Sequence, residues 1–127
     1  MDSEKPILLS GIKPTGRPHI GNYFGAMKQF VELQEQGYES NIFIADLHAL
    51  TTVRDGEILR KLSHELALDY LALGLDTDKT VFFRQSDVPE VTELAWILDC
   101  LAPMGLLERA HAWKDAQAKG NKEATVG

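Results

Sequence analysis

The stretch Ser10-Gly11-Ile12-Lys13-Pro14-Thr15-Gly16-Arg17-Pro18-His19-Ile20-Gly21-Asn22-Tyr23 decides the fold that this sequence predicts. The short apolar run before it, at 6–10, is typical of a buried strand. Two glycines and two prolines fall within 11–18 and indicate a shaped loop. Large apolar side chains then recur at steps of three or four, which predicts a helix over 20–34. The stretch is therefore expected to join a strand to a helix.

The chemistry of this loop favours an anion. Ligands bind at the C-terminal edge of open α/β sheets, where such a loop lies. A helix N-terminus adds unpaired N–H groups and the positive end of the helix dipole. His19 and Asn22 are three residues apart and share one face of the first turn, while Lys13 adds a positive charge. These features predict a cradle for the phosphates of a nucleotide.

The rest of the chain continues the alternation of strands and helices. The segments 41–45 and 80–84 are apolar and are predicted strands. A long helix, capped by its first residue, is predicted between them at 55–73. Asp87 is expected to cap a further helix, and 106–119 is predicted to form one more. The predicted order is therefore β-α-β-α-β-α-α.

This order predicts an α/β fold. Apolar strands that alternate with helices are typical of a parallel sheet covered on both faces. We expect residues 1–86 to form the N-terminal half of a doubly wound, Rossmann-type sheet, and 87–127 to form an incomplete helical segment. In the usual strand order 3-2-1-4-5 the fourth strand is missing here. One edge of the first strand, at Leu8 and Leu9, should therefore be unpaired.

Composition and charge limit the possible functions. The 127 residues suit one domain, and 19 acidic against 13 basic residues give a net charge of −6. That charge is a poor footprint for nucleic acid, so an RNA partner would need binding surface elsewhere or in a local patch. No apolar run approaches the roughly 20 residues of a membrane span, and the N-terminus has no secretory pattern. A cytoplasmic location and no membrane contact are expected.

Several segments resemble one protein family. His19-Ile20-Gly21-Asn22 is similar to the HIGH signature of class I aminoacyl-tRNA synthetases and related nucleotidyltransferases. The asparagine, and the residues on both sides of it, resemble the form of the signature in tryptophanyl-tRNA synthetases. Similar segments at 44–51, at 85–96 and at 107–114 follow in the order of that family. Over nearly its whole length, the chain therefore resembles the N-terminal part of a tryptophanyl-tRNA synthetase.

The resemblance implies an enzyme, a tryptophan–tRNA ligase, that uses ATP to activate tryptophan and transfers it to tRNA(Trp). The tryptophan carboxylate attacks the α-phosphorus, pyrophosphate leaves, and the adenylate then esterifies the tRNA. Such chemistry depends on positioning and on stabilising the charge of the phosphates. Mg²⁺ would accompany ATP, with no dedicated metal site on the protein.

The resemblance also assigns residues to roles. The implied ATP-binding residues are Lys13, Pro14, Thr15, Gly16, His19, Gly21 and Asn22. The implied catalytic residues are His19, Asn22 and Lys114, and the implied tryptophan-binding residues are Leu9, Gly11, Asp46 and His48. Family members often have Gln in place of Lys13, whose ammonium can reach a phosphate directly. A purely structural role stays open for His48, and Asp46 could instead orient His48 or cap the next turn.

In this family, further parts of the active site come after this chain's last residue. They include the acidic residue that recognises the indole N–H, a Lys-Met-Ser-Lys-Ser loop and the anticodon-reading domain. The resemblance thus implies that the chain alone does not charge tRNA, that tRNA binds mainly through C-terminal regions, and that the full-length protein is a homodimer. Two alternatives stay open: another class I-like nucleotidyltransferase, or a non-catalytic paralogue or dimerisation fragment using 94–107.

Overall fold

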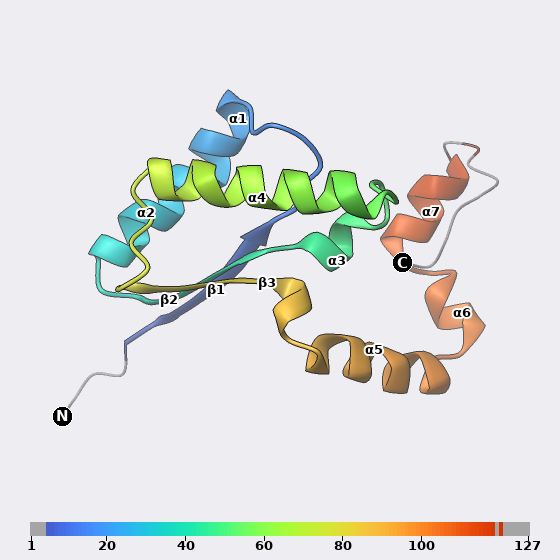
Figure 1. Ribbon diagram of the computed structural model, residues 1–127. Coiled ribbons are helices and arrows are strands. Elements are labelled where there is room, and N and C mark those ends of the chain that lie inside the picture. The colour runs from blue at the N-terminus through green and yellow to red at the C-terminus, as the bar shows by residue number, and fades with distance from the viewer. Residues whose placement is uncertain (1–4, 119, 121–127) are drawn as a thin grey trace. The chain divides into compact units, whose positions relative to one another are not determined.

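The computed structural model describes residues 5–118 and 120 (Figure 1). The chain divides into two compact units, Met1–Asp87 and Val88–Gly127. This division lies one residue beyond the boundary expected from the sequence. Among the described residues, the first unit has the sheet and the second has helices.

The first unit is built on three parallel strands in the order β1-β2-β3. They are β1 (Ile7–Ile12), β2 (Glu39–Ile44) and β3 (Thr80–Arg84). The third strand has the predicted bounds, and the first two differ from the prediction by one or two residues at each end. Within the described residues β1 pairs with β2 alone, so its outer edge is unpaired as predicted.

A continuous run of three helical segments follows the loop after β1. They are α1 (Ile20–Asn22), the π-helical segment η1 (Tyr23–Met27) and α2 (Lys28–Glu35). The predicted helix is therefore present, but its second turn is wider than an α-helix, a geometry that often occurs near functional sites. The periodicity of the sequence gave no sign of this change.

The long helix α4 (Gly56–Ala72) confirms the prediction from the sequence. Asp55 caps it, because its carboxylate oxygen accepts hydrogen bonds from the amides of Glu57 and Ile58 at 2.8 and 3.0 Å. The chain then turns at Gly74, whose φ of 99° favours glycine. The local signals at both ends of this helix were therefore sufficient to place it.

The core lies between the sheet and the helices α2 and α4, which Figure 1 shows on the same side of the strands. Met27, Phe30, Ile42 and Tyr70 are buried there. On the opposite face Leu9 is 65% exposed, so the helices of the first unit cover one face of the sheet, whereas covering of both was expected. The strands advance in one direction across the sheet, and crossovers of one hand then place both helices on one side.

Two short turns at the ends of β2 and β3 were not predicted. They are α3 (Asp46–Ala49) and the 3₁₀ turn η2 (Gln85–Asp87). The prediction that Asp87 caps the next helix is wrong, because its carboxylate accepts hydrogen bonds from the amide and guanidinium of Arg84. The next helix begins after Pro89, without a side-chain cap.

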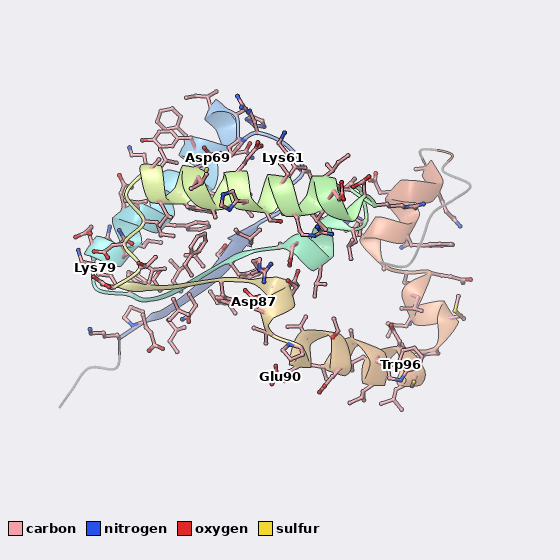
Figure 2. The ribbon with its side chains drawn as sticks, in the orientation of Figure 1. Lys61, Asp69, Lys79, Asp87, Glu90 and Trp96 are labelled. Atoms are coloured by element: carbon pink, nitrogen blue, oxygen red, sulfur yellow. The ribbon has the colours of Figure 1, made fainter. Side chains whose placement is uncertain are left out.

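The second unit contains α5 (Glu90–Leu101), α6 (Met104–Leu107) and α7 (His111–Ala118). The single helix predicted over 106–119 is thus two helices, since the amides of Arg109 and Ala110 bond to carbonyls three residues back and form a turn. Residue 119 lies outside the described residues. No residue of α5 is buried, and Trp96, labelled in Figure 2, is 71% exposed. No described helix is long and apolar enough to cross a membrane.

Candidate functional site

The loop after β1 forms one wall of a cavity of about 240 Å³. Its lining residues are Ile12, Lys13, Thr15, Gly16, Arg17, Pro18, His19, Asn22 and Leu66. The structure therefore brings together most of the predicted ATP-binding residues at the C-terminal end of β1. Pro14 is fully buried beside them, and Gly21 lies in the first helical turn without lining the cavity.

The charge of this cavity is positive, because Lys13 and Arg17 both line it and no carboxylate does. Arg17 was not selected from the sequence, and its place between Gly16 and Pro18 in the loop was the only available signal. The loop is held by a hydrogen bond from the amide of Thr15 to the carbonyl of Lys13 at 3.0 Å. Gly16 has a φ of 156°, in the range that side chains rarely adopt. The cavity suits an anion of the kind predicted.

His19 and Asn22 form a reciprocal cap at the start of α1. The Nδ1 atom of His19 accepts a hydrogen bond from the amide of Gly21 at 3.0 Å, and the Oδ1 atom of Asn22 accepts one from the amide of His19 at 3.0 Å. Two of the amides that we expected to face an anion are thus engaged by side chains. In the neutral imidazole, Nε2 must then have the proton and is the donor for a ligand.

Gly21 leaves the room that this cap needs. A Cβ atom at this position would lie 2.9 and 3.0 Å from two ring atoms of His19. Any side chain would therefore push the imidazole away from the amide that it caps. Gly21, to which the family resemblance gives a contact with ATP, also leaves room for the ring of His19.

The candidate tryptophan-binding residues lie at the ends of β1 and β2. Leu9 and Gly11 are on the open face of the sheet, where Gly11 pairs in register with Phe43. A Cβ atom on Gly11 would lie 2.8 Å from the ring of Phe43, so the glycine allows that ring to lie across β1. The rings of Phe43 and Phe83 have their centroids 5.7 Å apart. The two phenylalanines were missed, although their alternation with buried residues could have placed them on this face.

Asp46 and His48 differ in their surroundings. The carboxylate of Asp46 is buried and accepts hydrogen bonds from Leu47 and Ser86, whereas the side chain of His48 is exposed. Ser86 was not selected from the sequence, because its contact with Asp46 spans 40 residues. Both candidates lie on α3, two residues apart, but Asp46 is buried whereas His48 is exposed to solvent.

An ion pair lies at the end of β3. Arg84 and Asp87 form a salt bridge at 2.5 Å, and Figure 2 shows Asp87 in the turn that follows β3. Hydrogen bonds from the Arg84 side chain and then its amide hold the pKa of Asp87 below its usual range, and the same contact raises the pKa of Arg84. Lys114 lies on α7 of the second unit with an exposed side chain, so its role in the site rests on the sequence.

The class of the protein follows from this fold and this loop. The profile of the family described as "tRNA synthetases class I (W and Y)" matches residues 1–127, and the chain belongs to this family. The resemblance to the tryptophanyl branch is confirmed by curated relatives. The tryptophan–tRNA ligase of Rhodopirellula baltica is 63% identical over 113 residues, which cover 89% of this chain and 35% of that protein. The one of Fusobacterium nucleatum is 56% identical over 112 residues, 88% of this chain and 34% of that protein.

Solved structures agree with these relatives. Tryptophanyl-tRNA synthetase from Campylobacter jejuni has a TM-score of 0.84 at 50% identity, covering 95% of this chain and 38% of that one. Its complex with ADP and tryptophan has a TM-score of 0.81 at 51% identity, covering 94% and 37%. The predicted α/β class, as part of a doubly wound sheet, is thereby confirmed. The chain spans about a third of the length of the curated relatives it matches.

Proposed function

We propose that this chain supplies the ATP-binding half of the site in an enzyme that activates tryptophan with ATP and transfers it to tRNA(Trp). The observation that supports this most strongly is the cationic cavity at the end of β1, which combines Lys13, His19 and Asn22 in one loop. A related protein, 51% identical to this chain, has been solved with ADP and tryptophan. Activity requires the sequence elements that the complete relatives have beyond the matched third.

On the ATP side, the loop would neutralise and orient the phosphates. Lys13 and Arg17 supply positive charge, and His19 donates from Nε2 while its Nδ1 stays in the cap. Lys13, Pro14, Thr15, Gly16, His19, Gly21 and Asn22 are proposed to bind ATP. Mg²⁺ would be held by phosphate oxygens, because Lys13 and Arg17 line the cavity and no carboxylate that could bind a cation does. This donor set therefore fits the polyphosphate better than the metal.

On the tryptophan side, an apolar surface lies beside the same loop. Leu9 and Gly11 of β1 are proposed to line it, and Phe43 adds a ring to that face. An indole is a flat, largely apolar group that packs well against such a surface. His48 and Asp46, at the end of β2, are proposed to complete this side.

The reaction needs little from the protein beyond positioning. The carboxylate of tryptophan is ionised at neutral pH, so no general base is needed for it to attack the α-phosphorus. As the new oxygen–phosphorus bond forms, the bond to pyrophosphate breaks and negative charge grows on the leaving group. His19, Asn22 and Lys114 are proposed to stabilise that charge.

Calorimetric titration of the full-length protein with ATP, then with tryptophan or tyrosine, tests this proposal. We expect ATP to bind, and tryptophan to bind in preference to tyrosine. His19→Ala should weaken ATP binding about tenfold by removing a donor to a charged group, whereas His64→Ala, on the exposed side of α4, should not. Binding of ATP with no effect of either amino acid would favour the other nucleotidyltransferase, and equal effects of the two variants would contradict the assigned loop.

A homodimer is proposed for the full-length protein, supported by the apolar surface of α5. Its exposed large side chains are Val91, Leu94, Trp96, Ile97, Leu98 and Leu101. Exposed apolar patches of this kind often mark protein–protein contacts. Sedimentation equilibrium of the full-length protein tests this, with a monomer at all concentrations as the contrary result. Contacts with tRNA are proposed to lie mainly outside this chain, and a cytoplasmic location stays a prediction.

A further inference from the structure

The carboxylate of Asp46, beside the proposed tryptophan site, accepts three hydrogen bonds. Asp46 is only 8% exposed at the first residue of α3. Its Oδ1 atom accepts from the amides of Leu47 and Ser86 at 2.9 and 3.0 Å, and its Oδ2 atom accepts from the hydroxyl of Ser86 at 2.5 Å. Hydrogen bonds to an ionised acceptor are among the strong ones in proteins.

A third hydrogen bond joins the same two turns, and here the donor lies on α3 and the acceptor on η2. The amide of His48, on α3, donates to the Oε1 atom of Gln85, on η2, at 3.2 Å. The turns that end β2 and β3 are thus joined by groups 37 to 40 residues apart in the sequence. We call this set of contacts, made by Asp46, His48, Gln85 and Ser86, the clasp.

The clasp leaves Asp46 and His48 with different tasks. Because Asp46 is only 8% exposed and its carboxylate already accepts three hydrogen bonds, little of it is open to a ligand. His48 has the reverse arrangement, because its backbone amide is held while its imidazole is exposed. This geometry suits Asp46 to support the turn and His48 to contact the ligand.

We propose that Asp46 and Ser86 are positioning residues, which fix α3 so that the imidazole of His48 faces the tryptophan site. Asp46 acts through the clasp and does not touch the amino acid. This inference rests on the proposed function for the identity of the ligand, and on the hydrogen bonds alone for the clasp itself. Ser86 enters the site in this way although it lies outside every segment that was assigned to binding.

Asp76 provides a matched control in the same unit. Its carboxylate also accepts a bond from a backbone amide, that of Asp78 at 2.9 Å, and also closes a turn. That turn, however, precedes β3, whereas Ser86 follows it. Asp76→Ala therefore removes a comparable local contact at the opposite end of β3.

Amide hydrogen exchange of the 127-residue chain tests the clasp without any ligand. In Ser86→Ala we expect the amide of His48 to exchange about tenfold faster than in the wild type, since local opening becomes easier. Ser86→Thr, which keeps the hydroxyl, and Asp76→Ala should leave that amide protected. Unchanged protection in Ser86→Ala would overturn the clasp, provided that the thermal unfolding curves show both proteins folded.

Tryptophan titration of the full-length protein, which contains the complete site, tests the consequence for tryptophan binding. Ser86→Ala and Asp46→Ala should each weaken tryptophan binding about tenfold, and the double variant should be no weaker than the more affected single one, because both remove the bond between the Ser86 hydroxyl and the Asp46 carboxylate. ATP affinity should not change in any of them. Wild-type affinity in both single variants, or additive losses in the double variant, would overturn the positioning role. If the wild type binds no tryptophan while the exchange result holds, the proposed function fails and the clasp stands.

Discussion

The two units of this chain satisfy their apolar side chains in different ways. The first unit buries Met27, Ile42 and Tyr70 completely, in a core made from its own strands and helices. In the second unit, α5 has no buried residue, and Trp96 on it is exposed (Figure 2). The large apolar side chains of this helix are therefore exposed, in contrast to those of the core.

This contrast separates the parts of the site that the core of the first unit holds in place from the parts that it does not. The loop after β1 and the clasp are both supported by the internal core of the first unit, so their distances follow from local packing. An exposed apolar helix instead depends on a surface that other residues or another copy must provide. Lys114, on the second unit, therefore belongs with the features that need the complete protein.

The largest expected effect comes from removing apolar volume in each unit. Ile42→Ala should destabilise the chain by about 3 kcal/mol, because it leaves a cavity in a fully buried position. Ile97→Ala, on exposed α5, should change the free energy of unfolding by less than about 0.5 kcal/mol. Urea denaturation followed by circular dichroism measures both. Similar losses for the two substitutions would show that α5 is packed in solution and would remove the contrast.

A smaller effect is expected from two glycines of one helical run. Gly25→Ala meets no atom within 4 Å and should stabilise the helix by about 0.5 to 1 kcal/mol. Gly21→Ala collides with the His19 ring and should lose that gain, because it opens a cap that contributes about 1 kcal/mol.

Thermal unfolding and ATP titration of the two variants provide the measurement. ATP binding should weaken in Gly21→Ala, where the imidazole is displaced, and stay unchanged in Gly25→Ala. If both variants bind ATP equally well, the position of His19 in the cap does not matter for the nucleotide.

Much of the fold could be predicted because its signals are local. The spacing of apolar residues and the capping residue Asp55 placed α4, and an apolar run bounded by turns placed β3. Other features depend on contacts that no local pattern records. The π-helical segment η1 leaves no mark on the apolar periodicity, and Asp87 bonds to Arg84 instead of capping the next helix.

The candidate site likewise contains residues that local sequence patterns identify and residues that they do not. Lys13, His19 and Asn22 occur within one short motif, so their shared cavity could be predicted from the sequence. The alternation along β2 could have placed Phe43 on the open face, but its position opposite Gly11 depends on strand register. Ser86 could not be found, because its place depends on a contact across 40 residues. Sequence patterns thus identify the groups that meet a ligand more readily than the groups that hold them.

The smallest expected effect lies at Asp87, the last residue of the first unit. Arg84 lowers the pKa of this carboxylate from its ordinary value of 3.8, through a side-chain hydrogen bond first and a backbone one second. A lowered pKa in the folded state means that the ion pair stabilises the protein fully above that ordinary value, and that this contribution is lost as the pH falls through the lower folded value.

Asp87→Asn should therefore be slightly less stable than the wild type at pH 7, and the difference should shrink to nothing on acidification. Thermal unfolding of both proteins between pH 7 and about pH 2.5, a range that spans the ordinary pKa of Asp, measures it. High salt at pH 7 should also reduce the difference, since both side chains of the pair are largely exposed. A difference that grows as the pH falls would mean that Arg84 does not stabilise the ionised form, and that the clasp holds η2 beside α3 without help from this ion pair.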